Sequence, residues 1–138
     1  MFKVPAKFSS SVSCLLLVCG LTSSVSAATP SELQTWIDSP MRSLENKSRD
    51  QYRHPGETLN FFGLKPTMSV LEIWPARGWY TEILAPYLKA QGQLTIANFR
   101  KNDGTIEDEK KLFWARLSTK LDQDIAKHPE HFGAVTVL

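Results

Sequence analysis

Residues 68–80 read MSVLEIWPARGWY, and this stretch decides the fold. Its first part, Met68–Trp74, is a mostly apolar run between Pro66 and Pro75, which predicts a β-strand. A short turn follows, and Trp79–Leu88 then carries apolar residues at helical spacing. A strand, a turn and a helix in this order predict the first βα unit of an α/β domain.

The alternation of strands and helices continues to the last residue. Two further strands are predicted at Gln93–Phe99 and Gly133–Leu138, and a charged amphipathic helix at Ile106–Lys127. Pro86 removes one backbone hydrogen bond from the first helix, so we expect it to kink or shorten that helix. The β-α-β-α-β order predicts a parallel sheet with right-handed crossovers. We therefore expect a Rossmann-like α/β domain over residues 67–138, with a partial, three-stranded parallel sheet.

Residues 29–66 predict a helical lead-in rather than a separate domain. Thr29 is the expected N-cap of its first helix. Glu57–Phe62 predicts another short helix, with Gly63 just past its end. The polar segment Arg49–Pro55 between them is expected to be a loop.

The first 28 residues predict a secretory signal peptide. Lys3 and Lys7 form a basic region, Val12–Leu21 an apolar core, and Val25–Ala27 the small residues that signal peptidase needs. The core is too short to cross a bilayer as a helix. The alternatives are an uncleaved anchor or a buried N-terminal helix. We expect cleavage and a secreted, periplasmic mature protein with no membrane contact afterwards.

Composition narrows the class of protein. The 138 residues are 42% hydrophobic and 22% charged, which fits one globular domain. Without Lys3 and Lys7 the basic residues number 14, equal to the 14 acidic ones, so no basic field for nucleic acid remains. Cys14 and Cys19 also lie in the predicted signal. The mature chain is therefore expected to have no disulfide, cysteine nucleophile or thiolate metal site.

The turn after the first strand is the candidate site, because open parallel sheets bind ligands beyond the carboxyl ends of their strands. Ala76 and Gly78 are small enough for close approach, and the following helix offers free N–H groups. A G-x-G-x-x-G motif is absent, so an NAD site is not expected. Glu72 either contacts a ligand or bonds a neighbouring backbone N–H.

Other residues of chemical interest each have a structural alternative. Trp74, Trp79 and Tyr80 form either an aromatic wall for a ligand or part of the core. His54 is either a proton carrier in a loop that covers the turn or a solvent-exposed histidine.

His128 and His131 have a spacing that invites a zinc site, which would need Glu130 or Asp124 as a third ligand. Pro129 between them favours a turn instead, and we expect no metal.

Three segments together resemble a family of secreted, predicted class I methyltransferases, over roughly residues 49–138. Class I enzymes bind S-adenosylmethionine with an acid at the end of the first strand and glycines two, four and six positions later. Those positions are Glu72 and, in turn, Trp74, Ala76 and Gly78. The segments that carry the resemblance are Arg53–Leu59 (RHPGETL), Phe61–Gly63 (FFG) and Glu72–Leu88 (EIWPARGWYTEILAPYL).

The resemblance implies a cofactor site and a reaction. Glu72 and the backbone of Ala76, Arg77 and Gly78 would hold the amino-acid end of S-adenosylmethionine. Asn98 stands where the class presents an acid to the ribose hydroxyls, and offers only a neutral amide. The implied activity is methyl transfer to an unspecified acceptor, and no catalytic base is identified.

Two alternatives remain open. Trp74, Ala76 and Asn98 depart from the general class, which favours a non-catalytic Rossmann-like protein that binds another small ligand in the periplasm. The other alternative is an inactive, truncated remnant. The sheet of class I enzymes has seven strands in the order 3-2-1-4-5-7-6. By this resemblance, the chain would supply strands 1 to 3. We therefore expect the amino-terminal half of a longer protein or a truncated gene product, able to dimerise through the exposed edge of its first strand.

Overall fold

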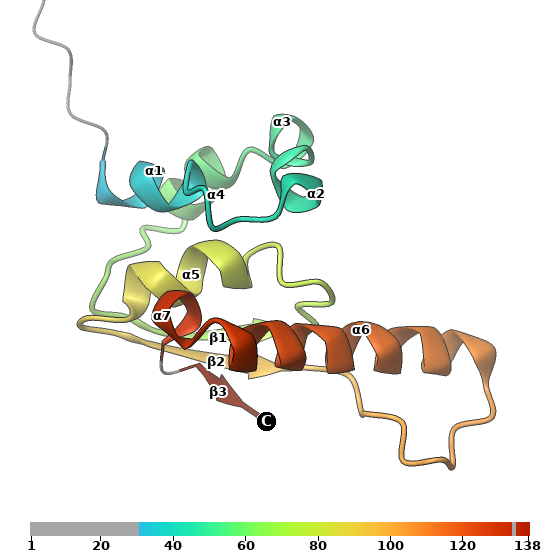
Figure 1. The fold of residues 1–138 in the computed structure, drawn as a ribbon. Coiled ribbons are helices and arrows are strands. Elements are labelled where there is room, and N and C mark those ends of the chain that lie inside the picture. The colour runs from blue at the N-terminus through green and yellow to red at the C-terminus, as the bar shows by residue number, and fades with distance from the viewer. Residues whose placement is uncertain (1–30, 134) are drawn as a thin grey trace, which may run out of the picture.

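The protein has an α/β fold in a computed structural model that describes residues 31–133 and 135–138 (Figure 1). The predicted signal peptide, residues 1–28, and the predicted N-cap Thr29 lie outside the described residues. The strands are β1 (Ser69–Ile73), β2 (Gln93–Ala97) and β3 (Thr136–Val137). The helices are α1 (Glu32–Ile37), α2 (Leu44–Lys47), α3 (Asp50–Arg53), α4 (Pro55–Phe61), α5 (Thr81–Leu88), α6 (Glu109–Lys127) and α7 (Pro129–Phe132).

The three strands form one parallel sheet in the order β1-β2-β3, which confirms the predicted sheet. Ser69 pairs with Gln93 and Ile73 with Ala97, so β1 and β2 end side by side. β3 pairs with β2 through only two residues. Within the described residues, β1 and β3 are therefore the two edges of the sheet.

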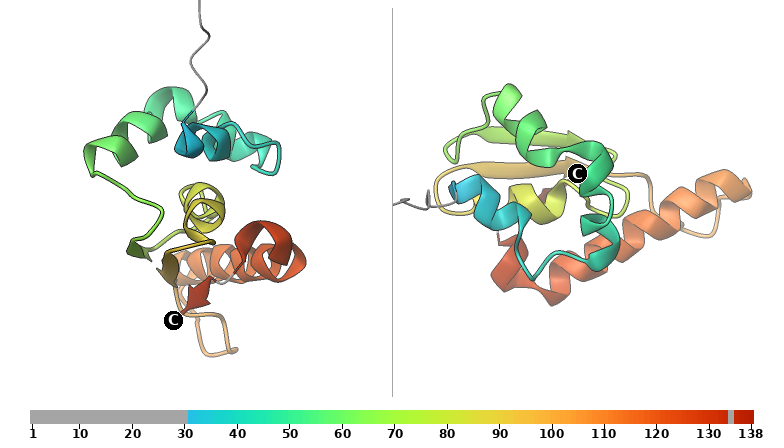
Figure 2. Two further views of the ribbon diagram at one scale, coloured as in Figure 1. Left: turned by 90° about the vertical axis from the view of Figure 1, so that its left-hand side faces the viewer. Right: turned by 90° about the horizontal axis from the view of Figure 1, so that it is seen from above.

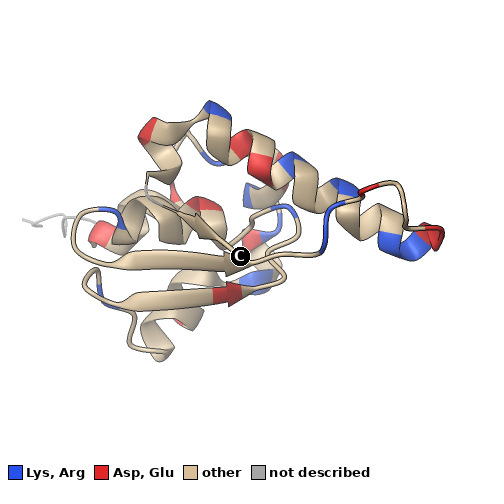
Figure 3. Cartoon of the chain, turned by 90° about the horizontal axis from the view of Figure 1, so that it is seen from below, with Lys and Arg blue, Asp and Glu red and all other residues tan. Residues whose placement is uncertain are grey.

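The helices lie on one face of this sheet. α5, α6 and α7 lie beside it, and α1–α4 lie over α5 on the side away from the strands (Figures 1 and 2). Leu94 and Ile96 of β2 point into the core, whereas Leu71 and Ile73 of β1 are 55% and 65% exposed. Figure 3 shows the opposite face of the sheet, where most charged residues lie on helices and loops and one acidic residue lies near the end of β1. No helix of the described chain covers that face.

Helix α5 contains Pro86 and still continues for two more residues. Proline has no N–H to donate to the Glu82 carbonyl one turn earlier. The buried His131 ring of α7 supplies that hydrogen bond, with its Nε2 3.0 Å from the Glu82 oxygen. Helix α5 therefore continues past Pro86 to Leu88, and the proline does not shorten it.

The lead-in differs from its prediction in two places. Within the described residues Ser31 caps α1, accepting a hydrogen bond from the Gln34 N–H. Residues 50–53 form helix α3 where a loop was predicted. The reason is a tertiary contact: the Asp50 carboxylate accepts two hydrogen bonds from the buried Arg42 guanidinium, at 2.6 and 3.0 Å.

A buried polar network then joins the lead-in to α5 and so fixes the turn that precedes it. The Trp79 indole N–H lies 2.9 Å from both the Asn46 carbonyl and the Asp50 carboxylate. The Ser43 N–H donates to the Glu82 carboxylate at 3.2 Å. Burial raises the pKa of Glu82, and hydrogen bonds from Ser43 and Asn46 together with the Arg42 charge partly oppose that shift.

Candidate functional site

The turn between β1 and α5 has an unusual backbone. Trp74, Ala76 and Gly78 have φ angles of 55°, 52° and 76°, in the left-handed region. A left-handed conformation costs a residue other than glycine roughly 1–2 kcal/mol. These are the three positions at which the resemblance to class I enzymes predicts glycines. Trp74 and Ala76 adopt there a backbone conformation that favours glycine.

Contacts at both ends hold this turn in place. The Trp74 N–H donates to the Ala97 carbonyl of β2, and the Gly78 N–H to the Pro75 carbonyl, each at 2.8 Å. The left-handed φ of Gly78 favours glycine. A Cβ atom there would also lie 2.6 Å from a methyl group of Leu121 of α6, so that side chain would have to shift.

Glu72, at the end of β1, is a polar group in an apolar setting. Its Oε2 accepts a hydrogen bond from the Thr81 hydroxyl at 2.7 Å, across the turn. Burial raises the pKa of Glu72 to about 7, against the opposing effects of Thr81 and the Arg53 charge. The carboxyl therefore exchanges a proton near neutral pH. A cavity of about 260 Å³ lies beside it, lined by Leu59, Phe62, Val70, Leu71, Tyr80 and Leu84.

Arg53 and Thr81 belong to this site, and sequence reasoning missed both. The Arg53 guanidinium lies 4.2 Å from the centre of the Trp79 ring and 5.8 Å from that of Tyr80. Arg53 lies in the segment 49–55, for which the sequence predicts a loop. Its helical setting depends on Asp50, and nothing local in the sequence indicates that setting.

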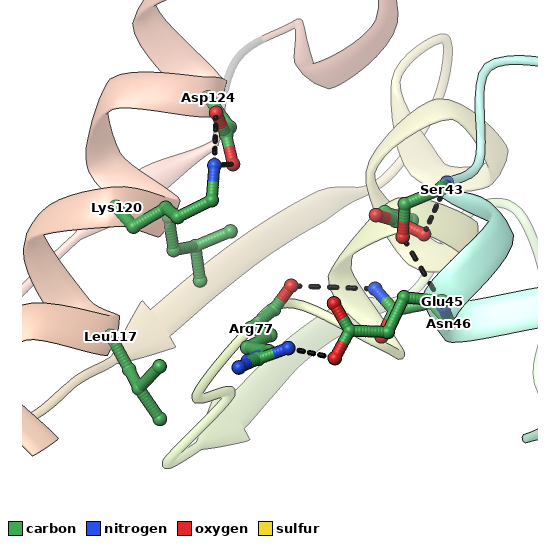
Figure 4. Close-up of a pocket in the computed structure, with 9 residues that line it drawn as sticks. Ser43, Glu45, Asn46, Arg77, Leu117, Lys120 and Asp124 are labelled. Atoms are coloured by element: carbon green, nitrogen blue, oxygen red, sulfur yellow. Dashed lines mark hydrogen bonds and ion pairs between the residues drawn. The ribbon is translucent and has the colours of Figure 1, made fainter. Parts of the chain in front are cut away.

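Arg77 points away from Glu72, toward α2. Its guanidinium forms an ion pair with Glu45, and its carbonyl accepts from the Asn46 side chain at 3.4 Å (Figure 4). Lys120 pairs with Asp124 at 3.1 Å on the opposite wall of the same cavity, which has a volume of about 360 Å³. The charges of these two pairs are matched within the cavity wall, and the carboxylate of Glu82, which also lines it, faces Arg42 at 3.8 Å.

Asn98 lies just past the end of β2, beside the turn. Its side-chain oxygen accepts a hydrogen bond from the Phe99 N–H at 2.9 Å. Its amide nitrogen is enclosed and has no partner within the described residues. The Phe99 ring stacks between Trp74 and Trp114, so aromatic side chains surround the end of β2.

The remaining candidates take structural positions. Trp79 is buried and bonded to the lead-in, as described above. His54 joins α3 to α4, and its ring is 58% exposed. His131 supports α5 instead of binding a metal, and Pro129 begins helix α7 rather than a simple turn. Within residues 31–133 and 135–138, no cluster of three potential metal ligands occurs.

Of the predicted cofactor residues, Glu72 lies at the end of β1 and Ala76 and Gly78 lie in the turn that follows it. Asn98 lies next to this turn, and Arg77 lines another cavity. Comparison with protein-family models, curated proteins and solved structures finds no match to this chain. No helix in the described part of the chain is long and apolar enough to cross a membrane.

Proposed function

We propose that this protein binds S-adenosylmethionine at the turn after β1 and is a methyltransferase-like protein with a Rossmann-type domain. The observation that carries the proposal is the left-handed backbone at Trp74, Ala76 and Gly78, two, four and six residues after Glu72. Strained residues of this kind cluster at functional sites, so two of them in the turn after β1 support a ligand-binding role for it.

The turn offers suitable groups for the amino-acid end of the cofactor. The Glu72 carboxylate would accept hydrogen bonds from an ammonium group. The N–H groups of Ala76 and Arg77 donate to no backbone acceptor within the described residues, so they are free for a carboxylate. When bound, S-adenosylmethionine supplies an electrophilic methyl group, and this chain's part is to hold it in position.

A second function, binding of another small ligand without catalysis, is favoured by Asn98. Its oxygen already accepts the Phe99 N–H, so Asn98 offers fewer acceptor sites to a pair of ribose hydroxyls than a carboxylate would. The same turn and the same Glu72 would serve that function.

Calorimetric titration with S-adenosylmethionine and S-adenosylhomocysteine tests the proposal. We expect both to bind, and Glu72→Gln to weaken binding about tenfold or more, because it removes the charge that faces the ammonium group. Glu107→Gln, an exposed carboxyl before α6, is the matched control and should leave affinity unchanged. Absence of binding by both compounds to the folded protein would overturn the proposal.

A further inference from the structure

Three aromatic rings form a continuous stack beside the candidate site. The ring centres of Trp74 and Phe99 lie 5.1 Å apart, with an angle of 18° between the ring planes. Those of Phe99 and Trp114 lie 4.9 Å apart, with an angle of 21°. The rings come from the turn after β1, the end of β2 and helix α6. The stack therefore crosses the carboxyl ends of two adjacent strands, where open α/β sheets bind ligands.

One end of this stack is open. Phe99 has a ring on each face, and Phe113 meets Trp114 edge-on at 5.2 Å. Trp74 is 66% exposed, and Phe99 is its only aromatic neighbour within the described residues. In that part of the chain, the cation found over aromatic rings is Arg53, which lies over Trp79 and Tyr80 and not over Trp74. The indole of Trp74 thus presents one free face to solvent.

This free face is held in a fixed orientation. The backbone N–H of Trp74 donates a hydrogen bond to the Ala97 carbonyl, and the indole ring stacks on Phe99. A surface that is already ordered loses little conformational entropy when a ligand covers it.

We propose that the free face of Trp74 stacks a purine ring, which extends the row of Trp74, Phe99 and Trp114 by one ring. This inference rests on the proposed function, because the purine is the adenine of the adenosyl ligand. Flat bases stack on aromatic side chains irrespective of their hydrogen-bonding edges, so the contact needs only a free ring face. Phe99 has a stacked neighbour in each pair, and Trp74 is the end of the row whose residue is 66% exposed.

Adenosine is the decisive probe, because it has the purine but neither the sulfonium nor the amino acid. Calorimetric titrations would compare adenosine and S-adenosylmethionine on the wild-type protein and on Trp74→Ala and Trp74→Phe. We expect Trp74→Ala to weaken both ligands about tenfold and Trp74→Phe to stay within about threefold of wild type. Phe61→Ala, which removes an 85% exposed ring on α4, is the matched control and should change neither affinity.

The outcomes separate this inference from the proposed function. Equal adenosine affinity in wild type and Trp74→Ala, each with a normal circular dichroism spectrum, overturns the inference. So does a loss confined to S-adenosylmethionine, which would indicate that Trp74 contacts the sulfonium instead. If adenosine binding depends on Trp74 but S-adenosylmethionine binds no better than adenosine, the inference stands and the proposed function fails. If no adenosyl compound binds, both fail.

Discussion

Ala76 holds a backbone conformation that glycine adopts at lower cost. Its φ of 52° predicts that Ala76→Gly stabilises the protein, by about 0.5–1 kcal/mol after the greater freedom of glycine in the unfolded chain is subtracted. The measurement is urea-induced unfolding. Ala85→Gly, the same change inside α5, is the control and should destabilise the protein by about 1 kcal/mol or more. Destabilisation by both changes would contradict the left-handed turn.

The raised pKa of Glu72 predicts that the stability of the protein depends on pH. Its pKa is raised from 4.5 to about 7, so the folded state binds the proton more tightly than the unfolded state. The free energy of unfolding should therefore fall as pH rises from about 5 to 7, by an amount on the order of 2–3 kcal/mol for this group.

Glu72→Gln isolates that contribution, because Glu82 and His131, whose pKa values are also shifted, are present in both proteins. Relative to the variant, wild type should lose stability between pH 5 and 8 in chemical denaturation. Parallel curves for the two proteins would contradict a raised pKa at Glu72.

Among the elements, the lead-in helices depend on one buried cation. Arg42 is 2% exposed and faces the Asp50 and Glu82 carboxylates. Arg42→Ala removes the ion-pair partner of both carboxylates and leaves them with the N–H donors of Trp79 and Ser43, so we expect a loss of about 3–5 kcal/mol in the free energy of unfolding. Arg100→Ala, which removes an exposed ion pair with Asp103, should leave the urea midpoint nearly unchanged. Similar midpoints for both variants would exclude this role of Arg42.

Local patterns predicted most of these elements and failed where a tertiary contact decides. Met68–Trp74 and Trp79–Leu88 were assigned correctly within two residues, because their apolar periodicity reports their burial. Helix α3 was missed because its Asp50 bonds Arg42, eight residues away in the chain. The continuation of α5 past Pro86 depends on His131, and no local pattern connects those two residues.

For the whole molecule, the order of strands and helices predicted the parallel sheet, since chain order and right-handed crossovers leave few arrangements. The sequence also placed Glu72, Ala76 and Gly78 in one turn, because they lie within seven residues of each other. It did not reveal that Arg77 turns toward Glu45, or that Phe99 lies between two tryptophans. Those contacts join segments from different parts of the chain. Dimerisation through β1 and secretion stay predictions.

Amide hydrogen exchange, followed by mass spectrometry with and without saturating S-adenosylmethionine, tests most directly where the ligand binds. The account predicts slower exchange in peptides that cover residues 72–80 and 97–100, and little change elsewhere in the chain. No protection in either segment, or protection confined to the cavity between Glu45 and Lys120, would contradict it.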